Sequence, residues 1–200
     1  MNACRRAGVL GVLLLAIASP AAAFDANETF RAKTFVLSVE GGVGDQSNLE
    51  NHRRETGFEF WNAGVRFSLL PFGVSFAGSP FAGALEVGLE PFYQKYTEPR
   101  SAFFAGLGAA FRYHFLALGR VVPYVELFAA AGGTDVSSHE IDSDFTFLLQ
   151  GGPGLSILIT DRAAIYGGYR FQHVSNGNTS RPNRGFESHS GVFGVSVFFP

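Results

Sequence analysis

The sequence has almost no cysteine, almost no net charge and only one long run of apolar residues. The single cysteine, Cys4, rules out an intramolecular disulfide and a cysteine-ligated metal site. A formal net charge of −2 provides no basic surface for nucleic acid. Beyond residue 23, no apolar run reaches the length of a membrane-spanning helix. The 200 residues still suffice for one domain with a sizeable core, so its stability must have another source.

The one apolar run lies at the N-terminus and predicts a secretory signal peptide. Arg5 and Arg6 precede the segment "AGVLGVLLLAIA", and alanines at 21–23 supply the small residues of a cleavage site. The run is too short to span a membrane as a helix. We therefore expect residues 1–23 to be removed and residues 24–200 to form a single exported domain.

Phenylalanine and glycine are abundant, with 22 and 25 copies, and apolar residues recur with a period of two. In "FFAGLGAAFRYHF", from Phe103 to Phe115, one face is apolar, whereas the other carries small residues, Arg112 and His114. The same alternation, interrupted by turn residues, predicts strands at roughly 34–44, 57–69, 82–95, 103–116, 121–131, 144–157, 163–173 and 187–199. Such alternation is typical of a soluble sandwich or of a membrane barrel, and it does not separate the two.

Three further features favour the membrane barrel. Short links, at 117–120 and 158–162, alternate with long polar loops, at 45–56, 132–143 and 174–186. The link at 70–81 is a longer exception on the side of the short links. The chain ends in an alternating segment that reaches an aromatic residue, Phe199, before Pro200. Aromatic residues also fall near the predicted strand ends, as expected for girdles at the membrane interfaces: Trp61, Tyr113, Tyr124, Tyr166 and Tyr169.

We therefore predict an all-β fold, an eight-stranded antiparallel transmembrane β-barrel of the bacterial outer membrane. An even number of strands places both termini on the periplasmic side, and eight strands leave an interior that side chains can fill. The alternation assigns to this interior Glu40, Arg66, Glu86, Glu90, Arg112, His114, Glu126, Gln150, Arg170 and Gln172. Because both signs of charge are present, they can pair, which predicts a packed lumen without a wide channel. In this lumen we expect His114 to form hydrogen bonds.

The segment "HVSNGNTSRPNRGFES" contains the side chains of a serine hydrolase triad. His173 and Ser175 share a face with apolar residues of the seventh strand, and Glu187 does so on the eighth. All three should therefore face lipid at the end of the long loops. Ser175 would be the nucleophile, His173 its base, and Glu187 the group that orients the imidazole. The same residue types are ordinary in exposed loops, so these residues alone leave that interpretation open.

Several residues near the triad could stabilise an oxyanion, namely Asn176, Asn183 and the backbone N–H groups around Gly177. The pattern includes no metal site. Acidic residues of another outer loop lack the spacing of a calcium site, and we expect them to be solvated: Asp135, Glu140, Asp142 and Asp144.

The segment "FQHVSNGNTSRPNRGFES" resembles the C-terminal signature of the lipid A 3-O-deacylase family of Gram-negative outer membranes. The resemblance rests on an H-x-S-N element, a later P-N-x-G and the following glutamate, and it covers about the last 35 residues. It implies an eight-stranded barrel that hydrolyses the ester-linked acyl chain at position 3 of lipid A. His173 would be the base, Ser175 the nucleophile and Glu187 the orienting acid, with Asn183 in the oxyanion hole. Asn178 stands where the family pattern has a glycine that offers a backbone donor, which puts the second oxyanion donor in doubt.

The resemblance also implies a partner and a location. Lipid A or lipopolysaccharide would be the substrate, no cofactor or metal would be required, and the protein would reside in the outer membrane of a Gram-negative bacterium. Basic residues at the loop end could contact the lipid phosphates, although each taken singly could equally be a solvated charge: Arg53, Arg54, Lys95, Arg100, Arg181 and Arg184. A homodimer is compatible with the sequence but not required by it.

Other functions fit parts of the sequence. The main alternative is a non-enzymatic structural or adhesion barrel with a vestigial motif. An outer-membrane acyltransferase would need an acceptor site, of which the sequence gives no sign. A soluble lipocalin-like binder would have an apolar lumen, contrary to the charged inward face predicted above.

Overall fold

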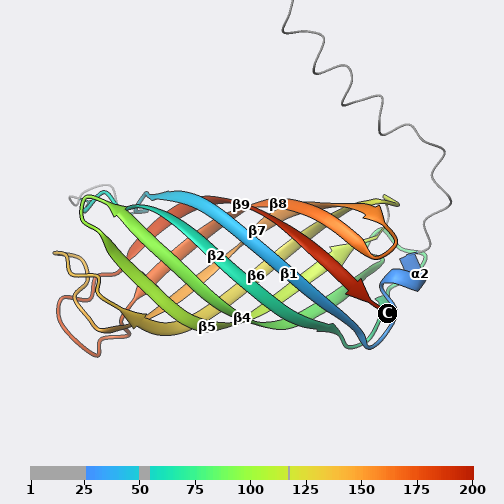
Figure 1. Ribbon diagram of the computed structural model, residues 1–200, viewed down its shortest axis with the longest axis horizontal. Coiled ribbons are helices and arrows are strands. Elements are labelled where there is room, and N and C mark those ends of the chain that lie inside the picture. The colour runs from blue at the N-terminus through green and yellow to red at the C-terminus, as the bar shows by residue number, and fades with distance from the viewer. Residues whose placement is uncertain (1–25, 50–54, 117) are drawn as a thin grey trace, which may run out of the picture.

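The alternating segments form an elongated β-barrel, shown by a computed structural model that describes residues 26–49, 55–116 and 118–200 (Figure 1). The predicted signal peptide, Arg53 and Arg54 lie outside the described residues. A short helix, α2 (Ala26–Thr29), precedes the strands. The strands are β1 (Thr34–Gln46), β2 (Glu59–Leu70), β3 (Val74–Ser75), β4 (Gly83–Glu98), β5 (Ala102–Phe115), β6 (Val121–Thr134), β7 (Phe145–Thr160), β8 (Ala163–Ser175) and β9 (Phe186–Phe199).

Eight long strands pair in antiparallel order around the barrel. The sheet runs β2-β1-β9-β8-β7-β6-β5-β4, and pairing of β2 with β4 closes it. Closure leaves no free long edge that could pair with another chain. The predicted strand number is confirmed, with strand ends shifted by a few residues. The two-residue strand β3, which pairs with β4, and helix α2 were not predicted.

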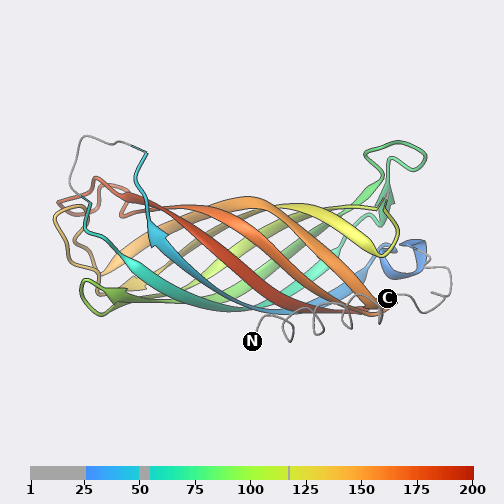
Figure 2. The ribbon, with the colours of Figure 1, turned by 90° about the horizontal axis from the view of Figure 1, so that it is seen from above.

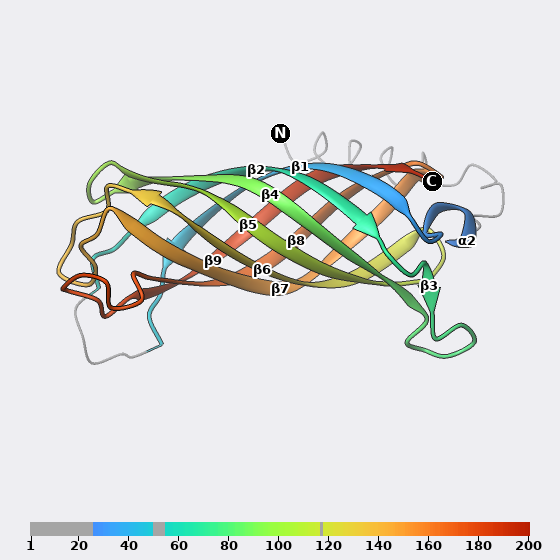
Figure 3. The same cartoon turned by 90° about the horizontal axis from the view of Figure 1, so that it is seen from below.

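The two ends of the barrel differ. Figures 2 and 3 show the loops β1–β2, β6–β7 and β8–β9 together at one end, with α2, β3 and the C-terminus at the other. The long polar connections therefore share one rim, which we call the outer rim. None of the helices in the described residues is long and apolar enough to cross a membrane.

The alternation in the sequence becomes an alternation of exposure. On β5, Phe111 is exposed, whereas Arg112 and His114 are buried. All ten residues predicted to face inward are buried. The assignment of Tyr124 and Tyr166 to an outer aromatic girdle is wrong, because both share the inward face of their strands and are buried. Their rings lie 4.4 and 4.3 Å from the guanidinium carbon of Arg112, so they line the lumen and stack on a cation.

Charged side chains fill the middle of the lumen as paired groups. Glu126 accepts from Arg66 at 2.6 Å, from Arg112 at 2.6 Å and from Arg170 at 2.9 Å. Arg66 also pairs with Glu90 at 2.6 Å. A buried charge is costly unless it is paired, and here one carboxylate serves three guanidinium groups. The prediction of a packed, charged lumen is confirmed.

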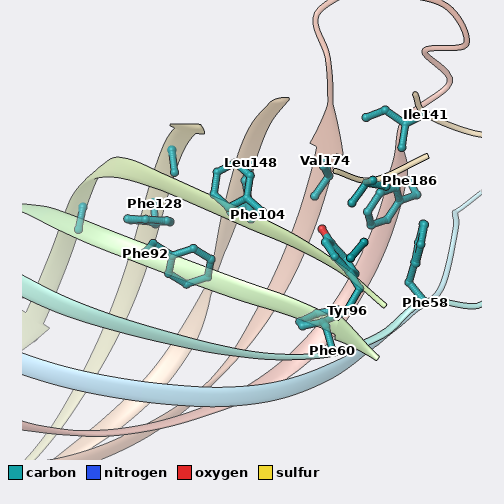
Figure 4. Packing of buried hydrophobic residues seen from close by; sticks show 14 residues of the cluster. Phe58, Phe60, Phe92, Tyr96, Phe104, Phe128, Ile141, Leu148, Val174 and Phe186 are labelled. Atoms are coloured by element: carbon teal, nitrogen blue, oxygen red, sulfur yellow. The ribbon is translucent and has the colours of Figure 1, made fainter. Parts of the chain in front are cut away.

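Apolar residues close the lumen on both sides of this charged layer. Near the outer rim a cluster includes Phe58, Tyr96, Phe104 and Phe186, whose side chains point into the barrel (Figure 4). At the other end Phe30 packs 5.2 Å from the ring of Phe198 and joins a second apolar cluster. The clusters fix the strand ends from within, including the ends of β8 and β9.

Candidate active site

The last two strands bring His173 and Glu187 together on the outer surface of the barrel. They are register partners on β8 and β9, so their side chains leave the same face of the sheet. His173 Nδ1 lies 2.8 Å from Glu187 Oε1, and the two side chains are 40% and 21% exposed. A carboxylate can only accept, so Nδ1 carries the proton and Nε2 remains available as a base.

Inward-facing neighbours hold this pair in place. Val174, between His173 and Ser175, is buried in the outer apolar cluster, as is Phe186 beside Glu187. The ring of Phe186 lies 4.8 Å from that of Phe58. The alternation that buries these residues thereby directs the polar side chains outward.

Ser175 is the last residue of β8 and lies on the same outer face as His173. The Ser175 hydroxyl makes no hydrogen bond with His173. The side chains of residues two apart on an extended strand start about 6–7 Å from each other, which is beyond hydrogen-bond distance. The structure therefore joins two of the three predicted triad residues and places the third next to them. Catalytic hydrogen bonds often shorten only when substrate is bound.

Gly185, the glycine of the P-N-x-G element, stands where a side chain would collide with the Val174 carbonyl oxygen and the histidine ring. Its φ of +63° lies in the left-handed region that favours glycine, and a Cβ there would lie 3.0 Å from His173 Cε1. Any larger residue would strain the loop and press on the imidazole.

The predicted oxyanion residues form a network within the loop between β8 and β9. The N–H of Asn176 donates to Asn183 Oδ1 at 2.8 Å, and its buried amide nitrogen donates to Ser180 Oγ at 2.8 Å. Asn183 Nδ2 donates to Asn178 Oδ1 at 3.2 Å. The role of Asn176 and Asn183 toward an oxyanion stays a prediction, and both would have to exchange a loop partner for it.

The two residues after Asn176 adopt left-handed conformations. Gly177 has φ +63° and Asn178 has φ +64°, and asparagine tolerates this region better than other residues with a Cβ. Asn178 therefore keeps a glycine-like backbone at the position where it departs from the family pattern. Its N–H donates to Asn176 Oδ1 at 3.0 Å, whereas the N–H of Gly177 makes no hydrogen bond with the described part of the chain.

A groove of about 360 Å³ lies across β1, β9 and β8, and its lining comes within two residues of Glu187 but includes neither member of the pair. Its lining includes Asp45, Tyr169 and His189, and the Tyr169 hydroxyl is hydrogen-bonded to His189 Nδ1. His189 follows Glu187 by two residues on the same face. No role was predicted for His189 from the sequence, although a polar residue on a lipid-facing strand was an available signal.

Glu140 in the loop between β6 and β7 was expected to be solvated, and this is wrong: its side chain is buried. Burial raises the pKa of its carboxyl group, but hydrogen bonds from Thr56, Gln46 and Asn48 outweigh this and hold the pKa below its usual value of 4.5. Asp142 and Asp144 are exposed, as expected. No group of three or more histidine, cysteine, aspartate or glutamate side chains in residues 26–49, 55–116 and 118–200 could hold a metal ion.

The described basic residues predicted for the loop end lie there. Lys95 is half-buried on the outer face of β4, and the others are exposed in turns and loops: Arg100, Arg181 and Arg184. Each is free of ion pairs with the described residues, so their charges remain available to an anionic partner.

Comparisons with known proteins match the chain to one family and to solved β-barrel structures. The family model "Lipid A 3-O-deacylase (PagL)" matches residues 52–196. The crystal structure of the outer membrane enzyme PagL superposes with a TM-score of 0.62 at 20% identity, covering 78% of this chain and 97% of that one. Neisserial surface protein A (NspA) superposes with a TM-score of 0.55 at 16% identity, covering 82% and 96%. No curated protein in the comparison matches the chain. The structural likenesses show the barrel fold, and the family match covers both strands of the His173–Glu187 pair.

Proposed function

Because the chain belongs to the PagL family of lipid A 3-O-deacylases, we propose that it hydrolyses the 3-O-linked acyl ester of lipid A with Ser175, His173 and Glu187. Its barrel fold and its family support a location in the outer membrane of a Gram-negative bacterium. The long-loop rim would face the outside of the cell, which puts the triad beside the lipid A of the outer leaflet.

The observation that carries this proposal is a hydrogen-bonded His–Glu pair on the surface that faces lipid. Polar and ionisable side chains on a membrane surface are costly, so they point to a function. The pair lies near the rim, where the ester linkages of a membrane lipid lie. A substrate that stays in the membrane reaches the site without leaving the bilayer.

The reaction would proceed in two halves. In the first, Ser175 Oγ attacks the ester carbonyl carbon while His173 Nε2 takes its proton, and Glu187 stabilises the resulting imidazolium. The tetrahedral intermediate collapses, the bond to the sugar oxygen breaks, and His173 returns the proton to that oxygen. In the second, water attacks the acyl-serine with His173 again as base, which releases the fatty acid and restores Ser175.

The negative oxygen of the intermediate would need hydrogen-bond donors. The N–H of Gly177 is the first candidate, because it is unused within the described chain and lies two residues from Ser175. The amide of Asn183 is the second, and it would have to release Asn178 Oδ1. Each donor directed at an oxyanion increases the rate by a factor of about 10²–10³.

The surroundings of the pair suit a negatively charged glycolipid. The basic residues of the rim, Lys95, Arg100, Arg181 and Arg184, can pair with lipid A phosphates, since guanidinium binds phosphate through two parallel hydrogen bonds. The groove across β1, β9 and β8, with Tyr169 and His189, offers space along the outer surface for part of the lipid. Neither feature requires a metal or a cofactor.

The test is mass spectrometry of lipid A incubated with the purified protein in detergent. We expect the wild type to remove the mass of one 3-hydroxyacyl chain and Ser175→Ala to remove none, whereas Ser101→Ala, at another exposed outer turn, should behave as wild type. Retained activity in Ser175→Ala would show that the nucleophile is another residue. If the wild type releases no chain from any lipid A tested, the chain is better described as a structural or adhesion barrel.

A further inference from the structure

Glu140 is a buried carboxylate among exposed loops, and within the described residues the donors to its carboxylate all come from the end of β1 and the residues just before β2. It accepts hydrogen bonds from Gln46 Nε2 at 2.8 Å, Asn48 Nδ2 at 2.6 Å, and Thr56 through its N–H at 3.0 Å and its hydroxyl at 2.5 Å. These residues belong to the end of β1 and the loop before β2. Hydrogen bonds to an ionised group are among the strong ones, so Glu140 anchors this loop firmly.

The backbone around Glu140 contacts a third loop, the one that carries the predicted oxyanion residues. The carbonyl oxygen of Glu140 accepts from the N–H of Arg184 at 2.8 Å. The next residue, Ile141, forms a β-bridge with Asn183. Glu140 thus connects the loops β1–β2, β6–β7 and β8–β9.

Asn48 continues this connection to the candidate active site. Its amide nitrogen donates to Glu140, and its amide oxygen accepts from the N–H of Glu187 at 3.0 Å. A carboxylate can only accept and an N–H can only donate, so the two partners fix the amide orientation. On either side of Asn48, the N–H of Ser47 donates to the Glu187 carbonyl at 3.0 Å and that of Leu49 to Glu187 Oε2 at 3.4 Å.

These contacts form one series of hydrogen bonds: Glu140 to Asn48, Asn48 to the Glu187 backbone, and the Glu187 carboxylate to His173. We propose that Glu140 is a positioning residue, which holds Glu187 against His173 through Asn48. The inference rests on the proposed function for its effect on catalysis, but the geometry it assigns can be measured without substrate. Catalytic groups need such support, because a displacement of about 1 Å can cost about 100-fold in rate.

The first measurement is the proton resonance of the His173 Nδ1–H in the full-length protein in detergent micelles, assigned by its loss in His173→Ala. We expect Glu140→Ala to broaden or remove this signal, and Asn48→Ala, which breaks the connection while leaving Glu140 bonded to Thr56 and Gln46, to do the same. Glu140→Gln keeps an acceptor oxygen and should retain the signal in part. Asp142→Ala, which removes an exposed acid from the same loop, is the matched control and should leave it unchanged.

The second measurement is a double-mutant cycle on lipid A hydrolysis. Glu140→Ala should lower kcat by about 10–100-fold with little change in KM, and it should lower it no further when Glu187 is already alanine. Multiplicative losses in the double variant would mean that Glu140 does not act through Glu187 and would overturn the inference. So would an unchanged His173 resonance in both Glu140→Ala and Asn48→Ala, even with an active wild type. If the wild type hydrolyses no lipid A, the proposed function fails, and the resonance still decides the geometry.

Discussion

The described part of the barrel contains two histidine–glutamate pairs with the same N···O distance in opposite surroundings. His114 Nε2 lies 2.8 Å from Glu86 Oε2 with side chains 2% and 1% exposed, and His173 Nδ1 lies 2.8 Å from Glu187 Oε1 with side chains 40% and 21% exposed. The first pair packs in the lumen, where the ring of Phe30 lies 5.0 Å from that of His114. The second has an open surface and Ser175 beside it. A histidine–glutamate pair alone is therefore no sign of catalysis. The role proposed for the His173–Glu187 pair rests on its open surface and on the neighbouring serine.

The lumen pair also shows why single substitutions of charged groups inside the barrel should be destabilising. Removal of one member leaves the other buried without a partner, and this costs more than the pair had contributed. At the outer rim, a side chain that loses its partner can turn to water or to a lipid headgroup. Substitutions in the two regions should therefore change different measurements.

The largest expected difference is between the two histidines. His173→Ala should reduce lipid A hydrolysis by roughly 10³-fold or more and leave the barrel folded, because the general base is lost at the surface. His114→Ala should lower the unfolding temperature and leave the activity of the folded protein near wild type. Gel mobility of unheated samples reports folding, and mass spectrometry reports hydrolysis. Loss of hydrolysis from folded His114→Ala protein would remove the distinction.

The next effect is on stability and is expected from the centre of the lumen. Glu126→Ala leaves Arg66, Arg112 and Arg170 without their common partner and should lower the free energy of unfolding by about 3–5 kcal/mol. The matched control is Asp161→Ala, which breaks an exposed pair with Arg120 and should cost at most about 1 kcal/mol. Urea unfolding in detergent compares the two, and equal costs would show that the lumen charges are hydrated and need no partner.

Within the His173–Glu187 pair, substitution of the two residues should lower kcat to different extents. Glu187→Ala should lower kcat less than His173→Ala does, because the glutamate orients and stabilises the imidazole while the histidine transfers the proton. Single-turnover kinetics with lipid A in detergent measure this step. Equal losses in the two variants would show that the imidazole does not act as a base without Glu187, so that the two residues act as one unit.

The smallest expected effect is the pH dependence of the stability of the outer loops. The pKa of Glu140 is lowered in the folded protein, so its contribution is complete above its usual pKa of 4.5 and is lost as pH falls below that value through the folded pKa. The protection of residues 46–49 and 55–58 against hydrogen exchange, relative to the intrinsic rate at each pH, should therefore stay high from neutral pH down to about 5 and fall at lower pH. Glu140→Gln, which does not titrate, should lack this loss of protection. An identical pH profile in both proteins would assign the change to another group.

Most of the barrel could be predicted because strands obey a local rule. A period of two identifies both the strands and their faces, and it placed Arg112, Glu126 and His173 on the correct sides. The same rule places Tyr124 inside the barrel, because Tyr124 and Glu126 are two residues apart and therefore lie on the same face of their strand. Proximity to a strand end predicts girdle positions for Tyr124 and Tyr166, but the alternation along each strand decides the face, and it directs both side chains into the lumen.

The outer loops could not be predicted in the same way. Loops have no periodicity, and the partners of Glu140 lie 84 to 94 residues away in the sequence. Nothing local to Glu140 distinguishes it from the exposed Asp142 and Asp144. The candidate site was found because its histidine, serine and glutamate lie close together in one segment, whereas the residues that support it are scattered over three loops.

The apolar clusters at the two ends of the lumen have a consequence for the cell. An outer membrane excludes many toxic solutes, and each open pore added to it weakens that exclusion. Here aromatic rings close the interior near the rim, and Phe30 closes the opposite end over a layer of paired charges. We expect the protein to conduct no ions in planar bilayers, so a bacterium could produce it in high copy number without becoming more sensitive to antibiotics that enter through pores.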